Sequence, residues 1–197
     1  MEISSLLKAC QITAAAVLDL YKGSKMLSDA FLMRKIEQFA KEPFSEKSKK
    51  FIACMDADKF EKIQEQIIYA ITQAESISKA LYAKRLVEAY CEQNIDWSTY
   101  CRMNFILCQV FSHDFVALVT YYNNELDSEV TQNKLNQFAQ LGLVDYNLYG
   151  DDELPWEYKF LRNDLGRNFI RCVLFDVDAN LKTKIENKRR AILNTKF

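Results

Sequence analysis

The sequence predicts a mainly α-helical protein: a multi-helix bundle followed by a small C-terminal segment with a winged-helix-like β-hairpin. Three observations lead to this fold class. Only four glycines and two prolines occur in 197 residues, so turns are few and long helices are favoured. Apolar residues recur every three or four positions along most of the chain, as on the buried face of a helix. Strand-forming residues are concentrated between about 143 and 161.

The stretch from Ile77 to Asn123 is the expected centre of the bundle. Breaks at 94–96 and 112–114 divide it into three helices, and Asp96 stands where an N-cap is expected. Helices this apolar must bury a face against other helices. The residues expected in the core are Ile67, Phe105, Ile106, Val110 and Leu118.

Further helices are expected on both sides of this centre. Before it, amphipathic patterns predict helices over 3–22, 25–41 and 58–74, and Ser45 is an expected cap of a short helix through Met55. After it, a helix begins at Ser128 or Thr131 and closes at Gly142.

The last third of the chain reads as helix, hairpin, helix. Strands are expected over 143–149 and 156–161, a helix from Asn163 or Asp164, and a last helix from Ala179 to about Asn194. The expected organisation is a helical bundle over 1–123 and a winged-helix-like segment with a C-terminal basic helix over 124–197. The two parts could also pack as one domain.

The charges argue against DNA as the partner of this winged-helix outline. The net charge of the chain is −1. Between Asn123 and Glu157 there are eight acidic residues and one base, Lys134, which gives −7. Binding of DNA relies on the neutralisation of phosphates, so an acidic wing would be repelled. From Ala179 onward the chain instead carries about +5. A solvated basic helix is the first interpretation, and the alternatives are contact with an acidic partner, with nucleic acid or with the acidic hairpin of a second copy.

No motif predicts catalysis, a cofactor or a metal. The single histidine, His113, has no evident catalytic partners, and no phosphate-binding glycine loop occurs. The acidic residues of 56–65 are interleaved with lysines, so a solvated helix start is preferred to a cation site. The six cysteines form no C-x-x-C pair, and we expect reduced thiols in a cytoplasmic protein without a signal peptide or membrane span.

Five stretches resemble a loosely defined set of small helical bacterial and prophage proteins. They are Ser24–Phe39, Lys79–Lys84, Ile95–Tyr100, Leu141–Val144 and Asp164–Phe169, and the resemblance covers about two thirds of the chain. It implies a helical body, a small hairpin-containing C-terminal part and a mobile-element context. It transfers no catalytic residue to this chain.

The sequence therefore predicts a non-enzymatic binding protein of a phage or other mobile element, acting on a protein partner in host defence or phage control. A nucleic-acid-binding regulator is the alternative, and an enzyme with an atypical site is the third hypothesis. We expect a homodimer that binds nucleic acid weakly. The candidate partner-binding residues are Trp156, Phe160, Lys188, Arg189 and Arg190.

Overall fold

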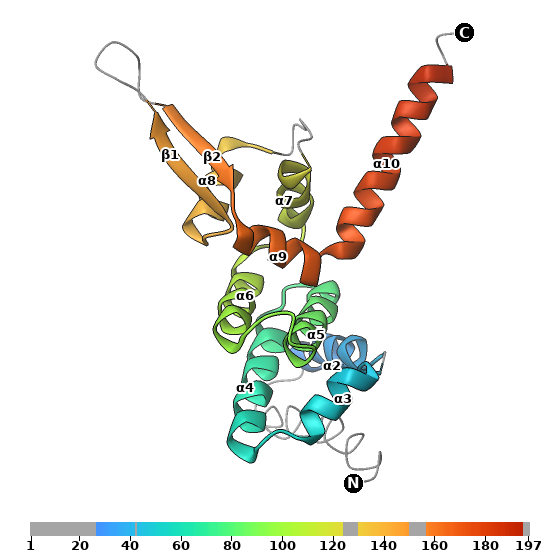
Figure 1. The fold of residues 1–197 in the computed structure, drawn as a ribbon. Coiled ribbons are helices and arrows are strands. Elements are labelled where there is room, and N and C mark those ends of the chain that lie inside the picture. Colours follow the sequence, from blue (N-terminus) through green and yellow to red (C-terminus); the bar gives the residue numbers. More distant parts are fainter. Residues whose placement is uncertain (1–26, 42, 124–129, 150–156, 195–197) are drawn as a thin grey trace. The chain divides into compact units, whose positions relative to one another are not determined.

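The described part of the chain is mainly helical with one β-hairpin, as the sequence predicts (Figure 1). The computed structural model describes residues 27–41, 43–123, 130–149 and 157–194. The expected helix over 3–22 lies outside these residues. Two compact units are present, Met1–Ser112 and His113–Phe197.

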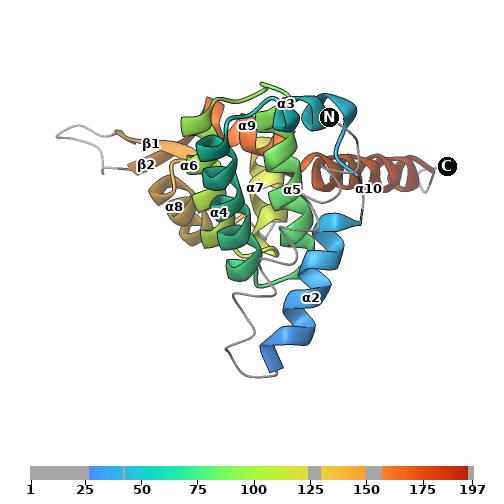
Figure 2. The same cartoon turned by 90° about the horizontal axis from the view of Figure 1, so that it is seen from below.

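The first unit is organised around one central helix. Its helices are α2 (Leu27–Ala40), α3 (Glu46–Ala53), α4 (Ala57–Gln73), α5 (Ile77–Cys91) and α6 (Trp97–Gln109). Helix α5 contacts each of the other four, and in the view from below it stands beside α4 and α6 (Figure 2). Most of its residues are buried. This explains why the polar residues of α5 are not gathered on one continuous face.

Side-chain caps fix where these helices begin. The carboxylate of Asp96 accepts a hydrogen bond from the backbone N–H of Thr99, and the hydroxyl of Ser45 accepts one from Ser48. Both caps were expected from the sequence. Asp56 and Ser76 cap α4 and α5 in the same way. Each cap satisfies an amide that the helix itself leaves without an acceptor.

The predicted core is confirmed for four of its five residues. Ile67, Ile106, Val110 and Leu118 are buried. The prediction for Phe105 is wrong, because its side chain is 53% exposed. The buried stripe of α6 instead runs through Met103, Ile106, Leu107 and Val110, and successive helical positions differ by about 100°.

The second unit holds the hairpin. Its elements are α7 (Asp114–Tyr122), α8 (Gln132–Gln140), β1 (Val144–Tyr149), β2 (Glu157–Arg162), α9 (Asp164–Val173) and α10 (Phe175–Asn194). The unit begins at His113, one helix before the boundary expected after Asn123. Helix α7 belongs to this unit because it packs on α8 and α10.

The last two helices follow one another almost without interruption. Helix α10 begins at Phe175 rather than at Ala179, since only Leu174 separates it from α9. It contacts α7 and α9. Both views show α10 and the hairpin leading away from each other within this unit (Figures 1 and 2). None of the described helices combines the length and apolar character needed to cross a membrane.

Two helices end in the same left-handed turn with different residues. After α8, Gly142 has φ 72° and the N–H of Leu143 donates to the carbonyl of Phe138. After α5, Gln93 has φ 63° and the N–H of Asn94 donates to the carbonyl of Ala89. A helix end of this kind, closed by backbone hydrogen bonds around a left-handed residue, favours glycine at that residue. Gly142 therefore closes α8, as the sequence predicts.

Candidate functional site

The hairpin exposes an apolar face, which we define as Tyr146, Leu148 and Phe160. The antiparallel register places Tyr146 opposite Phe160, and residues directly opposite in such a pair project from the same side of the sheet. Leu148 lies two residues along β1 from Tyr146 and shares that side. Tyr146 is 58% exposed, Leu148 is 49% exposed and Phe160 is half-buried.

The base of the hairpin is buried and firmly held. Leu143 and Val144 are buried. At the other strand, the guanidinium Nε of Arg162 donates to the carbonyl of Tyr121 at 2.9 Å, and the guanidinium also lies over the Tyr121 ring. The hairpin face therefore extends beyond a fixed base that contacts α7.

A tyrosine hydroxyl at the end of α7 sets the position of both strands. Tyr122 Oη donates to the carbonyl of Leu143 at 2.5 Å and accepts from the backbone N–H of Asn163 at 3.0 Å. Asn163 in turn caps α9 by accepting from the N–H of Gly166. Gly166 is required there, since a methyl group at its Cα would overlap Tyr122 Oη and the carbonyl of Leu143.

The predicted binding residues are not brought together by the described structure. Phe160 lies on the hairpin face. Trp156 lies outside the described residues, as do the side chains of Lys188, Arg189 and Arg190, whose backbone belongs to α10. Because α10 leads away from the hairpin, the basic helix does not fold back on the hairpin of its own chain (Figure 1).

Sequence reasoning missed Tyr146 and Leu148 as surface residues. The signal was present, since Val-Asp-Tyr-Asn-Leu-Tyr alternates apolar and polar residues with the period of a strand. Such a pattern normally marks a face turned to the core. Here Val144, at its first position, is buried, whereas Tyr146 and Leu148 are exposed.

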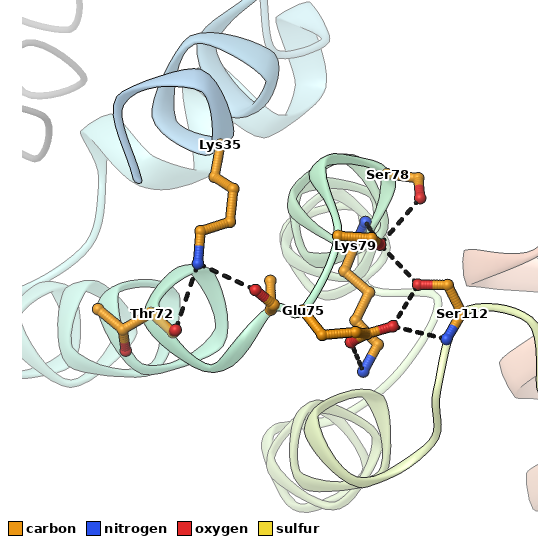
Figure 3. Close-up of polar contacts among 8 residues, drawn as sticks. Lys35, Thr72, Glu75, Ser78, Lys79 and Ser112 are labelled. Carbon is orange, nitrogen blue, oxygen red and sulfur yellow. Dashed lines mark hydrogen bonds and ion pairs between the residues drawn. The ribbon is translucent and has the colours of Figure 1, made fainter. Parts of the chain in front are cut away.

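The first unit contains a second candidate, which we call the buried polar cluster: the buried lysines Lys35 and Lys79 together with the partly exposed Glu75 and Ser112 (Figure 3). Lys35 Nζ donates to the carbonyls of Thr72 and Ala74 at the end of α4, at 3.3 and 2.9 Å. Glu75 pairs with Lys79 Nζ at 2.5 Å. Its other oxygen accepts from the backbone N–H of Ser112 at 2.6 Å and from the Ser112 hydroxyl.

The ionisation of this cluster follows from its surroundings. Burial lowers the pKa of Lys35, and the nearby Glu75 carboxylate opposes that change. For Glu75, burial would raise the pKa, but hydrogen bonds from Lys79 and Ser112 lower it overall. Each charged group has a specific partner, and these partners join α2, the turn between α4 and α5, and the end of α6. The cluster thus holds these three parts of the first unit together.

The sole histidine lies on the surface and belongs to a small ion-pair group. His113 stands at the N-cap position of α7, and its Nε2 lies 3.4 Å from Asp114 Oδ1. The same carboxylate oxygen lies 3.2 Å from Lys134 Nζ. The His113 side chain is 74% exposed, whereas the Asp114 side chain is only 6% exposed.

The described cysteines are free thiols, and two of them, Cys91 and Cys108, are poorly suited to nucleophilic chemistry. Burial, with the charges of Glu88 and Glu92, raises the pKa of Cys91 to about 12. Burial also raises the pKa of Cys108 to about 11. A thiol must ionise to act as a nucleophile or metal ligand. Over the described ranges, no group of three or more acidic, histidine or cysteine side chains is arranged to hold a metal ion.

Comparisons with known proteins identify no relative. No family model matches the chain, no curated protein matches it, and no solved structure matches it. The geometry of the hairpin face and of the buried polar cluster is therefore the basis for any functional assignment.

Proposed function

We propose that this chain is a non-enzymatic binding protein of a phage or other mobile element, and that the hairpin face binds a protein partner. The observation that carries the proposal is the exposure of Tyr146 and Leu148 on a hairpin with a buried, fixed base. Exposed apolar clusters on an otherwise polar surface are typical of protein-binding sites, and tyrosine is enriched at their centres.

The chemistry of the polar groups supports a binding role over catalysis. Glu75, Lys35 and Lys79 are held by structural contacts, and the thiols of Cys91 and Cys108 are strongly disfavoured as thiolates. The resemblance to small prophage proteins supports the mobile-element context. We place the protein in the cytoplasm, where it would occupy a partner in host defence or phage control.

We also propose that the protein forms a homodimer. The acidic stretch around the hairpin and the basic end of the chain have opposite charge, −7 against about +5. Among the described residues α10 leads away from the hairpin of its own chain (Figure 1), so we propose that the two stretches meet between copies. Exposed ion pairs contribute little free energy, so apolar contacts must supply most of the affinity.

The binding role can be tested by site-specific photocrosslinking in the native host. A benzophenone amino acid would replace Tyr146, and a matched control would replace Tyr69, a 41% exposed tyrosine on α4. We expect one protein to be captured reproducibly from position 146 and not from position 69. Tyr146→Ser with Leu148→Ser should weaken binding of that purified protein at least tenfold, whereas Tyr69→Ser should not.

Three results would contradict the proposal. One is equal capture from positions 146 and 69, and another is unchanged affinity of the double serine variant. The third concerns nucleic acid. A duplex bound with sub-micromolar affinity at about 150 mM salt would favour the nucleic-acid-binding regulator instead, because that affinity requires a phosphate-neutralising surface.

A further inference from the structure

The hairpin is a two-stranded sheet, so both of its strands have an outer edge. An outer edge presents backbone N–H and C=O groups that can pair with a further strand, and proteins block unwanted pairing with lysine or proline on the edge. Strand β2 has Lys159 near its centre, and this residue is exposed. Strand β1 contains neither lysine, arginine nor proline.

Among the described elements of its own unit, the edge of β1 is also open. In both views, none of the described elements of the second unit lies alongside the outer edge of the distal half of β1 (Figures 1 and 2). Helix α8 contacts β1 and joins it near the buried base at Leu143. The side chains of Tyr146 and Leu148 are about half exposed on one face of the strand, and Asn147 is exposed on the other.

We propose that β1 pairs antiparallel with β1 of a second copy, around a two-fold axis at Asn147, and so forms a four-stranded sheet. This inference rests on the proposed function, because it names the second copy as the molecule that completes the binding face. The axis places Asn147 opposite Asn147 of the other copy. Tyr146 then lies opposite Leu148, twice, and Asp145 lies opposite Tyr149.

The side chains select this register over its alternatives. Pairing around Asn147 joins apolar residues to apolar residues on one face and places no like charges opposite each other, which would destabilise the pair. A shift of one residue would send the two hairpin faces to opposite sides of the sheet. The equivalent pairing of β2 around Lys159 would place two lysines opposite one another.

The four-stranded sheet has a specific consequence for binding. Residues directly opposite project from the same side, so the hairpin faces of the two copies form one continuous surface. An isolated hairpin is marginally stable, and additional strands stabilise it. The second copy therefore stabilises the hairpin and also doubles the apolar surface to which a partner can bind.

Cysteine crosslinking tests this pairing directly. In a Cys54→Ser background, Asn147→Cys is compared with Lys159→Cys, since the register places these two residues opposite each other on one face. Across the proposed axis, the Cα atoms of position 147 are about 5 Å apart, within disulfide range. Those of position 159 are three strand spacings apart, roughly 14 Å. We expect a disulfide-linked dimer from Asn147→Cys, and none from Lys159→Cys or the background.

Light scattering across a concentration series provides the independent measurement. The wild type should be dimeric, and Asn147→Lys should raise the dimer Kd at least tenfold because two lysines then face each other. Lys159→Asn should leave the Kd unchanged. Far-ultraviolet circular dichroism of each variant checks that it is folded.

The outcomes separate this proposal from the partner-binding role. A wild type that stays monomeric at high micromolar concentration overturns the pairing. Photocrosslinking from position 146 then still tests whether the hairpin face binds a protein partner. A dimer that crosslinks equally from positions 147 and 159 overturns the pairing as well. The pairing is also overturned if the folded Asn147→Lys variant has the same dimer Kd as the wild type.

Discussion

Two tyrosines, one in each compact unit, make opposite use of their hydroxyl groups. Tyr100 is buried in an aromatic cluster, where its ring stacks on Trp97 at 5.2 Å and lies 5.4 Å from Tyr90. Its hydroxyl has no hydrogen-bond partner among the described residues. The hydroxyl of Tyr122 instead bonds to the backbone on both sides of the hairpin.

The difference shows how each unit is held together. The first unit surrounds α5 with four helices and is stabilised mainly by apolar packing, to which the buried polar cluster adds hydrogen bonds between distant segments. A tyrosine can therefore serve there through its ring alone. The second unit must hold a hairpin against short helices, and it does so by hydrogen bonds between segments about 20 to 40 residues apart. Substitutions that remove packing and substitutions that remove single polar atoms should therefore act differently on the two units.

The largest effect is expected in the packed core of the first unit. Ile106→Ala removes buried methyl groups and leaves a cavity, which should lower the free energy of unfolding by about 2–5 kcal/mol. The adjacent Phe105→Ala should change it by no more than about 0.5 kcal/mol, because Phe105 is exposed. Chemical denaturation of both variants provides the measurement, and equal losses would contradict the role of packing.

In the second unit, Gly166→Ala should lower the free energy of unfolding by about 1–3 kcal/mol. The added methyl group overlaps Tyr122 Oη and the carbonyl of Leu143, and crowding of a packed site typically costs this much. A double-mutant cycle with Tyr122→Phe is the control. The loss should shrink once the hydroxyl is removed, so strict additivity would show that the clash does not involve Tyr122.

Removal of the Tyr122 hydroxyl alone should cost about 1–2 kcal/mol. Tyr122→Phe keeps the ring but leaves the carbonyl of Leu143 and the N–H of Asn163 without their partner. Thermal or chemical unfolding gives the stability change, and amide hydrogen exchange at Asn163 should become faster. A neutral effect on both would mean that the hydroxyl does not hold the hairpin.

The buried polar cluster should have a smaller, pH-dependent effect. Glu75→Gln weakens the hydrogen-bond acceptor of Lys79, whose side chain is only 2% exposed. Because Glu75 itself is partly exposed, the free energy of unfolding should fall by only about 1 kcal/mol at pH 7. The folded-state pKa of Glu75 lies below the ordinary 4.5. Its stabilisation is therefore complete above about pH 4.5 and is lost as the pH falls through the lower, folded-state pKa.

A surface pair provides the control for this prediction. Glu46 pairs with Lys49 on α3 at 2.6 Å, but its side chain is 79% exposed. Glu46→Gln should leave the unfolding curve unchanged within error at pH 7. Unfolding measured from pH 3 to 7 should show the difference between wild type and Glu75→Gln narrowing below pH 4.5. A difference that stays constant would argue against ionisation of Glu75 as its source.

The smallest effect is expected at Tyr100. Tyr100→Phe removes a buried hydroxyl that lacks a partner among the described residues, so the free energy of unfolding should stay unchanged or rise by up to about 1 kcal/mol. This is the opposite sign to Tyr122→Phe. A loss of more than about 1 kcal/mol would indicate that the Tyr100 hydroxyl bonds to a group outside the described residues.

Local signals in the sequence predicted the fold well. Asp96, Ser45, Thr131 and Asn163 each mark a helix start, because capping depends on a few adjacent residues. The start of α10 was placed four residues late, since α9 leads into it without a turn residue. Burial of Phe105 was wrongly predicted, because residue type alone does not show on which side of a helix the core lies.

The candidate sites were harder to predict, for a physical reason. Phe160 was identified from its residue type, but Tyr146 and Leu148 were taken only as strand formers. Their exposure depends on where the sheet ends and what covers it. The contacts of Lys35 with Ala74 and of Tyr122 with Asn163 join residues 39 and 41 positions apart. No local pattern encodes such pairs.

The turn after α5 is a position at which one substitution would make the protein more stable. Gln93 holds the left-handed conformation that Gly142 adopts after α8. A residue with a Cβ pays roughly 1–2 kcal/mol for this conformation, and glycine avoids most of it at some cost in chain entropy. Gln93→Gly thus offers a more tolerant background in which surface residues of the first unit can be varied without unfolding it.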